Sequence, residues 1–275
     1  MRLRKPRRPR PVRRTARESF RRGIFLLPSL FTVGNMLCGF AAILHAVHGR
    51  LELAGWLIIL AGVLDGLDGR IARLMHSTSD FGKEYDSLAD VVSFGVAPAL
   101  LAYQWGLVTT GRWGWAVAFL FLVAGSVRLA RFNVHVATGD KRFFTGLPIP
   151  AGAGSLTMMI LVAPEPVVDR IETVVVSAFV FLVSVLMVST IPYRSYKDFS
   201  PRQRWPAAAF FLFALIVAVI VVSPVPVMAF LAAAYLLSGP VEMSIGALRR
   251  RHRGRQSEII EAPRAATPPV HTDRP

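Results

Sequence analysis

The sequence DGLDGRIARLMHSTSDFGKEYDSLAD occupies residues 65–90. The fold must accommodate the acidic side chains of this stretch. The pattern D-x2-D-G-x2-A-R-x8-G-x3-D-x3-D places four aspartates among long apolar runs: Asp65, Asp68, Asp86 and Asp90. A charged side chain inside a membrane helix costs about 2.5–3.5 kcal/mol on insertion scales. The four acids therefore need a compensating partner, and a pair of divalent cations is the most economical one.

The composition and the apolar runs predict an all-α, polytopic membrane helix bundle. The chain has 275 residues, of which 53% are hydrophobic, and its mean hydropathy of +0.47 is too high for an ordinary soluble domain. A spanning helix needs about 20 mostly apolar residues. About eight transmembrane helices can be drawn, at residues 26–48, 52–74, 84–107, 113–132, 148–164, 168–191, 206–223 and 226–247.

The formal charge of +15 is concentrated at the chain ends and in alternate connections. Residues 1–22 alone hold eleven Lys and Arg residues and one acid. By the positive-inside rule, this bias predicts that both termini and the acidic motif face the cytoplasm, in a multi-pass protein of the inner membrane. The basic tail could bind anionic lipid or act only as an orientation signal. No nucleic-acid reading module accompanies it, so we expect no nucleic-acid partner.

Three regions follow from this pattern. Residues 1–23 form a basic cytoplasmic tail, 24–247 the membrane domain, and 248–275 a disordered cytoplasmic tail. The single cysteine, Cys38, excludes an intramolecular disulfide.

The four acids of the motif are spaced to share helix faces. Asp65 and Asp68 are three residues apart, and Asp86 and Asp90 are four apart, so each pair projects from one side of its helix. A short polar stretch separates the two pairs, which can therefore face each other across a helix hairpin. Carboxylate oxygens suit Mg²⁺ or Mn²⁺, and no His or Cys joins the set, which disfavours zinc. Two such cations would clamp the oxygens of an in-line phosphoryl displacement.

Small and basic residues accompany the acids. Gly69 and Gly82 would let backbone approach a phosphate-bearing ligand. Arg73, about one turn beyond Asp68, could reach a phosphate or a carboxylate with a bidentate contact. The alternative is that these charges form structural ion pairs at a wet helix end.

The run from Asp65 to Asp90 resembles the signature of the CDP-alcohol phosphotransferases, and every signature position matches. In that family a CDP-activated molecule loses CMP when an alcohol attacks its phosphorus. The resemblance implies that the four aspartates surround two divalent cations, Mg²⁺ or Mn²⁺, in a polar cavity open to the cytoplasm. It implies that Asp90 is the general base taking the proton of the alcohol. It also implies that Gly69, Arg73 and Gly82 line the CDP site.

The flanks resemble bacterial membrane-type phosphatidylserine synthases over roughly residues 24–200. The matching runs are LPSLFTVGN at 27–35, DSLADVVSFG at 86–95, RLARFN at 128–133, FTGLP at 144–148 and IPYRSYK at 191–197. Ser29 departs from the pattern, since relatives often carry Asn there. The resemblance implies transfer of a phosphatidyl group from CDP-diacylglycerol to L-serine, by a homodimer embedded in membrane lipid.

Further polar residues are candidates for substrate contact. Asn35 could meet the donor head group, and Arg128 and Arg131 could hold the donor diphosphate or the serine carboxylate. Arg194 and Lys197 have the same potential. For each cation the alternative is ordinary topology charge, and for Asn35 a polar contact between helices.

Three other functions stay open at this point. Another acceptor, such as glycerol 3-phosphate or inositol phosphate, would use the same chemistry. An ion transporter could use intramembrane acids, although no second copy of the acidic motif is present. A lipid-binding scaffold without chemistry would not need the full acid set.

Overall fold

The computed structural model describes residues 16–74, 80–137, 146–191, 193 and 211–261, except 212–213, 216–217 and 220. Side chains are described within residues 30–244 of these ranges, apart from 72–74 and 135–137. The described residues form helices and contain no strand. The predicted all-α class is therefore confirmed.

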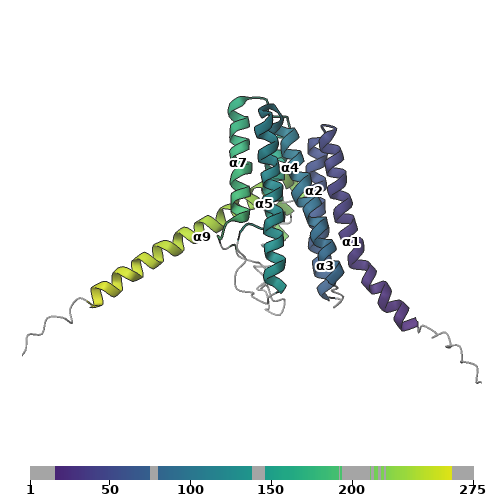
Figure 1. Ribbon diagram of the computed structural model, residues 1–275, viewed down its shortest axis with the longest axis horizontal. Coiled ribbons are helices and arrows are strands. Elements are labelled where there is room, and N and C mark those ends of the chain that lie inside the picture. The colour runs from purple at the N-terminus through teal and green to yellow at the C-terminus, as the bar shows by residue number, and fades with distance from the viewer. Residues whose placement is uncertain are drawn as a thin grey trace, which may run out of the picture.

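The first two helices form an antiparallel hairpin (Figure 1). Helix α1 spans Ala16–Val47 and α2 spans Leu51–Leu74. Gly49 adopts a φ of 73° in the tight turn between them, a backbone conformation that favours glycine. Ala42, Ala46 and Ala54 are fully buried, and such small side chains let the two backbones approach closely.

The segment from Asp80 to Thr110 is a continuous helical path with two wide turns. It comprises α3 (Asp80–Asp90), the π-helix η1 (Val91–Val96), α4 (Ala97–Ala102), the π-helix η2 (Tyr103–Leu107) and the 3₁₀ turn η3 (Val108–Thr110). Pro98 lies in the first turn of α4 and cannot donate a backbone hydrogen bond. The wide turn of η1 comes directly before Pro98, so the backbone hydrogen-bond pattern of the helix changes where the proline donor is missing.

Three further described helices pack against this segment. They are α5 (Arg112–Ala137), α6 (Ile149–Val162) and α7 (Arg170–Val188). The Trp105 indole donates to the Ala163 carbonyl at 2.8 Å, which ties η2 to the α6–α7 connection. Asp169 begins α7 as its N-cap, accepting from the amides of Ile171 and Glu172.

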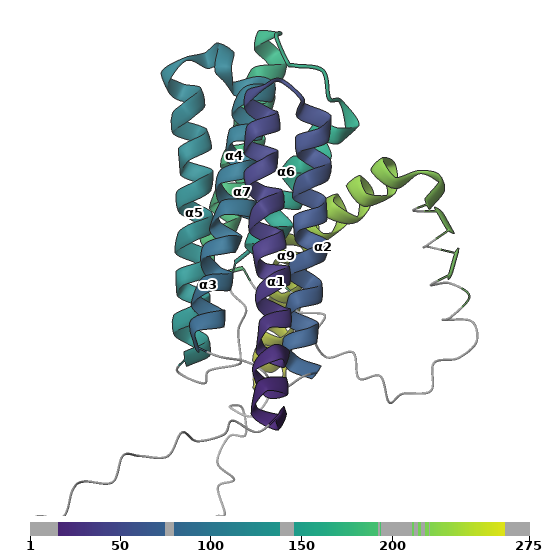
Figure 2. The same cartoon turned by 90° about the vertical axis from the view of Figure 1, so that its right-hand side faces the viewer.

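The last described helix leaves the bundle at an angle. Helix α9 spans Pro224–Glu261 and projects away from the other helices (Figure 1). In the view of Figure 2 it crosses behind α2 and α1. It packs against α6. It continues past residue 247, the predicted end of the last span, so residues 248–261 of the expected disordered tail are helical. Likewise α1 begins at Ala16, inside the expected N-terminal tail.

Within the part of the chain that the structure describes, five helical stretches are long and apolar enough to cross a membrane. They are Leu30–Val47, Asp80–Thr110, Arg112–Val134, Arg170–Val188 and Pro224–Ser244. Helix α2 is 24 residues long but carries several charges, and α6 has only 14 residues. The expected span at 206–223 lies mostly outside the described residues. The chain is thus an integral membrane protein, and the number eight stays a prediction.

Candidate active site

Three of the four motif aspartates come together at one end of the bundle. One carboxylate oxygen from each of Asp65, Asp86 and Asp90 lies within 4.8 Å of the others. Asp65 lies near the end of α2, whereas the other two lie on consecutive turns of α3. Asp90 is buried, with 8% of its surface exposed, and the other two are partly buried. The structure thus brings Asp65 of the first acid pair beside Asp86 and Asp90 of the second pair.

Asp68 is buried beside this trio and has a different partner. Its carboxylate accepts a hydrogen bond from the Thr32 hydroxyl of α1. Both side chains are almost fully buried, with 6% and 4% of their surfaces exposed. The first helix therefore lines the acid cluster, which the pattern of residues 65–90 alone does not predict.

A second contact from α1 reaches Asp90. The Asn35 side-chain amide donates to the Asp90 carboxylate at 3.3 Å. The Ser93 hydroxyl donates to the Asn35 carbonyl at 2.9 Å, which fixes the backbone that carries the amide. A methyl group added at Gly39, one turn further on, would lie 2.7 Å from the Ser93 Cα, so α1 and η1 can approach this closely only at a glycine.

The donor chemistry of the cluster fits a hard divalent cation. Three carboxylates this close repel one another strongly unless a positive charge lies between them. Asp86 Oδ1 and Asn35 Oδ1 are buried without a hydrogen-bond partner among the described residues. An unpaired buried oxygen is costly, and a cation would satisfy it. All of these donors are oxygens, the ligand type that Mg²⁺ and Mn²⁺ prefer.

The two candidate arginines of α5 have different surroundings. Arg128 is buried, with 7% of its surface exposed, and its guanidinium carbon lies 5.3 Å from the centre of the Phe132 ring. Its charge interacts with Asp90. Arg131 is partly buried and donates to the Val188 carbonyl at the end of α7, at 3.1 Å. Arg128 is thus linked by charge to the acid cluster, and Arg131 contacts the end of α7.

The remaining predicted site residues lie around the helix ends. Gly69 is exposed, and nothing lies within 4 Å of a Cβ added there. Gly82 lies in the first turns of α3. Arg73 belongs to α2, but its side chain lies outside the described part, as do Arg194 and Lys197 altogether.

Two side-chain pairs between distant segments were not predicted from the sequence. Asn133 of α5 donates to the Ser87 hydroxyl of α3 at 2.8 Å, and Ser87 donates in turn to the Lys83 carbonyl. Tyr193 packs against Tyr235 of α9. Asn133 and Tyr193 belong to runs that the sequence analysis singled out, but neither run indicates a partner so distant along the chain.

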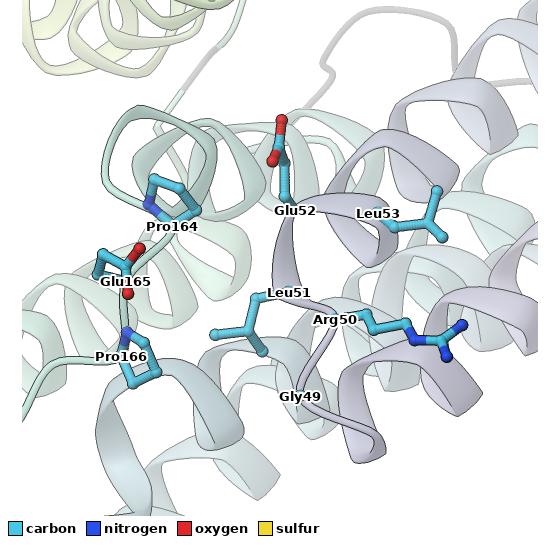
Figure 3. Close-up of a pocket in the computed structure, with 8 residues that line it drawn as sticks. All are labelled: Gly49, Arg50, Leu51, Glu52, Leu53, Pro164, Glu165 and Pro166. Atoms are coloured by element: carbon cyan, nitrogen blue, oxygen red, sulfur yellow. The ribbon is translucent and has the colours of Figure 1, made fainter.

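An open pocket of about 400 Å³ lies at the other end of the hairpin (Figure 3). Its lining comes from the α1–α2 turn and the α6–α7 connection: Gly49, Arg50, Leu51, Glu52, Leu53, Pro164, Glu165 and Pro166. Asp65 is fourteen residues further along α2, or about 20 Å at 1.5 Å per residue. This pocket is therefore separate from the acid cluster, and the cavity expected beside the acids stays a prediction.

Comparison with known proteins gives one family. The model of the CDP-alcohol phosphatidyltransferase family matches residues 25–190. A CDP-diacylglycerol–serine O-phosphatidyltransferase of Helicobacter pylori (strain ATCC 700392 / 26695) is 38% identical over 218 residues, which cover 78% of this chain and 90% of the relative. The Bacillus subtilis (strain 168) protein of the same name is 34% identical, over 65% of this chain and 98% of its own. An archaetidylserine synthase of Methanothermobacter thermautotrophicus is 39% identical over 61% of this chain and 69% of the relative.

Proposed function

This chain belongs to the CDP-alcohol phosphatidyltransferase family, and from that premise we propose that it transfers the phosphatidyl group of CDP-diacylglycerol to L-serine. The products are phosphatidylserine and CMP. The observation that carries this proposal is the close approach of Asp65, Asp86 and Asp90. They occur in a chain that is 38% identical to a serine phosphatidyltransferase over 90% of that relative's length. The family match favours transfer chemistry over the ion-transporter alternative.

Asp90 is the proposed general base. The serine hydroxyl oxygen forms a bond to the phosphorus nearer the lipid, and the bond from that phosphorus to the CMP oxygen breaks. The proton of the hydroxyl passes to the Asp90 carboxylate. The hydrogen bond from Asn35 holds that carboxylate in place on the side facing α1. Burial keeps bulk water away from the base.

The four motif aspartates are the proposed holders of two divalent cations, Mg²⁺ or Mn²⁺. When bound, the ions supply charge neutralisation for the diphosphate and for the developing alkoxide. Asp65, Asp86 and Asp90 offer oxygens within 4.8 Å of one another, and Asp68 lies beside them on α2. The bond from Thr32 orients Asp68.

The remaining candidates would bind substrate. Arg128 and Arg131 can hold the donor diphosphate or the serine carboxylate, since a guanidinium matches both groups. Gly69 leaves open space at the end of α2, which a CDP head group could occupy beside Arg73 and Gly82. Asn35 is also a proposed contact of the donor head group, because its side-chain oxygen Oδ1 has no hydrogen-bond partner among the described residues.

We further propose the setting of this reaction. The membrane domain spans residues 24–247, with the acid cluster and both tails, 1–23 and 248–275, on the cytoplasmic side of the inner membrane. Soluble L-serine reaches the site from there, and lipid substrate reaches it from the bilayer. A homodimer is the proposed assembly.

The test is CMP release by the purified protein. Reactions contain CDP-diacylglycerol and Mg²⁺ or Mn²⁺, with L-serine, glycerol 3-phosphate or inositol phosphate as acceptor. We expect release with serine alone. Release only with a phosphorylated alcohol would keep the family assignment and change the acceptor. If none of the three acceptors gave CMP release, the proposal would be contradicted.

A further inference from the structure

Helix α1 contributes no acid to the cluster, yet two of its polar side chains contact the acids. Thr32 and Asn35 are three residues apart on α1, so they project from one face of the helix. The Thr32 hydroxyl donates to Oδ2 of Asp68 on α2, and the Asn35 amide donates to Asp90 at the end of α3. Thr32 and Asn35 are buried, with 4% and 0% of their surfaces exposed. One face of α1 thus contacts acids that belong to two other helices.

Asp68 differs from the other three acids of the motif in its surroundings. Among the described residues, the group of carboxylates whose oxygens lie within 4.8 Å of one another is Asp65, Asp86 and Asp90. Asp68 is buried beside that group, and it forms no ion pair with any residue that the structure describes. The Thr32 hydroxyl is therefore the donor that holds the Asp68 carboxylate.

A hydrogen bond to one carboxylate oxygen affects what the other oxygen can do. The Thr32 hydroxyl occupies Oδ2 of Asp68, which leaves Oδ1 to bind a cation. Carboxylates that ligate metals are commonly fixed by such hydrogen bonds, and losing the bond typically weakens metal affinity about 10- to 100-fold. The terminal torsion of an aspartate is broad, so a carboxylate without this bond would hold its oxygens less firmly in place.

The packing of α1 does not depend on the Thr32 hydroxyl alone. Three fully buried alanines pack the hairpin of α1 and α2 toward its turn: Ala42, Ala46 and Ala54. The Ser93 hydroxyl donates to the Asn35 carbonyl at 2.9 Å, which joins α1 to η1. These contacts remain when the hydroxyl is removed, so its effect on the site can be measured in a folded protein.

We infer that Thr32 is a positioning residue that acts through Asp68: its hydroxyl holds Oδ2 and so keeps Oδ1 in place to bind a divalent cation. Helix α1 thereby sets the cation affinity of a site whose charged ligands all lie on α2 and α3. This inference rests on the proposed function, in which Asp68 is one of the four holders of two cations. It adds a residue whose loss weakens cation binding although every ligand is still present.

The first test is Thr32→Val, which removes the hydroxyl and keeps the size of the side chain. Binding of Mn²⁺ to the purified protein in detergent is measured by electron paramagnetic resonance, without substrate. We expect the dissociation constant to rise about 10- to 100-fold. Thr32→Ser keeps the hydroxyl and should bind Mn²⁺ nearly as the wild type does.

The matched control is Thr157→Val in α6. Thr157 is also fully buried, but its hydroxyl has no hydrogen-bond partner among the described residues. The substitution therefore removes a buried hydroxyl without removing a described contact to an acid. We expect Thr157→Val to bind Mn²⁺ with wild-type affinity.

Activity and unfolding measurements separate positioning from a structural role. In Thr32→Val, the Mn²⁺ concentration that gives half-maximal CMP release should rise by the same factor as the dissociation constant. The kcat at saturating Mn²⁺ should recover most of its wild-type value, because all four acids are intact. Thermal unfolding in the presence of a chelator compares the metal-free proteins. If both Thr32→Val and Thr32→Ala failed to fold, the role of Thr32 would be structural and the inference would be overturned.

A double-mutant cycle tests whether the effect passes through Asp68. In an Asp68→Asn background, Thr32→Val should weaken Mn²⁺ binding no further. Additive effects in the double mutant, or equal dissociation constants for the wild type and Thr32→Val, would overturn the inference. The proposed function fails by a different result, namely a wild type that binds Mn²⁺ and releases no CMP with serine.

Discussion

Asp90 lies where three helical segments meet, and its surroundings define its expected behaviour. It is buried, it accepts from Asn35, and it shares the cluster with Asp65 and Asp86. Asp90→Asn keeps the size of the side chain and removes the proton acceptor. We expect CMP release with serine to fall about 10²–10⁴-fold, the usual contribution of a general base. Asp80→Asn is the control, because Asp80 pairs only at the surface with Lys83. A variant with wild-type turnover would exclude Asp90 as the base.

The Asn35 amide gives a second prediction at the same carboxylate. Asn35→Ala removes the donor to Asp90, and a bond to a charged group contributes about 1.5–3 kcal/mol. We therefore expect kcat to fall roughly 10- to 100-fold, at about 1.4 kcal/mol for each factor of ten. Ser126→Ala is the control, because Ser126 donates only to a carbonyl of its own helix. An unchanged kcat would mean that Asp90 is held in place by other contacts.

The acid trio predicts a metal requirement. Removing divalent cations with a chelator should abolish CMP release, and adding Mg²⁺ or Mn²⁺ should restore it. Asp86→Asn removes one ligand, so binding of Mn²⁺, measured by electron paramagnetic resonance without any substrate, should weaken. Glu165→Gln, at the far end of the hairpin, should bind Mn²⁺ as the wild type does. Full activity after chelation would argue against a metal site.

At this scale the sequence predicts neighbours within a helix better than partners between helices. The spacing of Asp86 and Asp90 places both on one face, and the structure brings them beside Asp65 as expected. The bond from Asn35 to Asp90 joins residues 55 positions apart. Periodicity defines which residues share a face, but the rotation of one helix against another comes from packing, so this partner could not be predicted.

Among the elements, the contact between α1 and η1 makes the clearest prediction. A Cβ at Gly39 would lie 2.4 Å from the Ser93 hydroxyl and 2.7 Å from its Cα, and backbone cannot move aside cheaply. We expect Gly39→Ala to destabilise the protein by about 1–3 kcal/mol, as other overpacking substitutions do. Denaturant unfolding in detergent measures the change.

The control for Gly39→Ala is the same substitution in open space. Nothing lies within 4 Å of a Cβ added at Gly154 of α6. Gly154→Ala should be neutral or should stabilise the helix by up to about 0.5–1 kcal/mol, because alanine loses less backbone entropy on folding than glycine. Equal effects at the two positions would contradict the proposed close approach at Gly39.

Element boundaries show where the sequence prediction was limited. The expected span at 84–107 lies inside the continuous path from Asp80 to Thr110, but apolar periodicity did not predict its two π-helical turns. The first of them directly precedes Pro98, which cannot donate a backbone hydrogen bond. Similarly, α9 runs to Glu261 because its basic segment, which is too polar for a span, remains helical. Hydropathy detects the part of a helix inside the bilayer and not its full length.

For the whole molecule, apolar surface and buried alanines agree with a membrane bundle. Large apolar side chains such as Leu37, Phe40 and Phe119 are exposed on the outside, whereas Ala42, Ala54 and other small residues fill the interior. A soluble protein rarely exposes so much apolar surface. The sequence could predict this arrangement because hydrophobicity alone separates a membrane protein from a soluble one.

The orientation of the molecule is the remaining prediction. If the acid cluster faces the cytoplasm, Lys83 at the start of α3 lies inside and Arg50 at the α1–α2 turn lies outside. Both residues are exposed, and Cys38 is the only cysteine, so Cys38→Ala provides a background for single reporters. A membrane-impermeant maleimide should label Arg50→Cys in intact cells, and Lys83→Cys only after the membrane is opened.

Arg112→Cys is the matched reporter for this topology. Arg112 follows the Gly111 turn at the end of the span Asp80–Thr110, so it should be labelled from the same side as Arg50→Cys. The reverse pattern at all three positions would place the acid cluster outside, against the excess of Lys and Arg in the connections on its side. Labelling of Lys83→Cys and Arg112→Cys from the same side would instead contradict the membrane crossing between Asp80 and Thr110. Opposite labelling is expected because Lys83 lies at the end of this segment that holds the acid cluster, and Arg112 follows its other end.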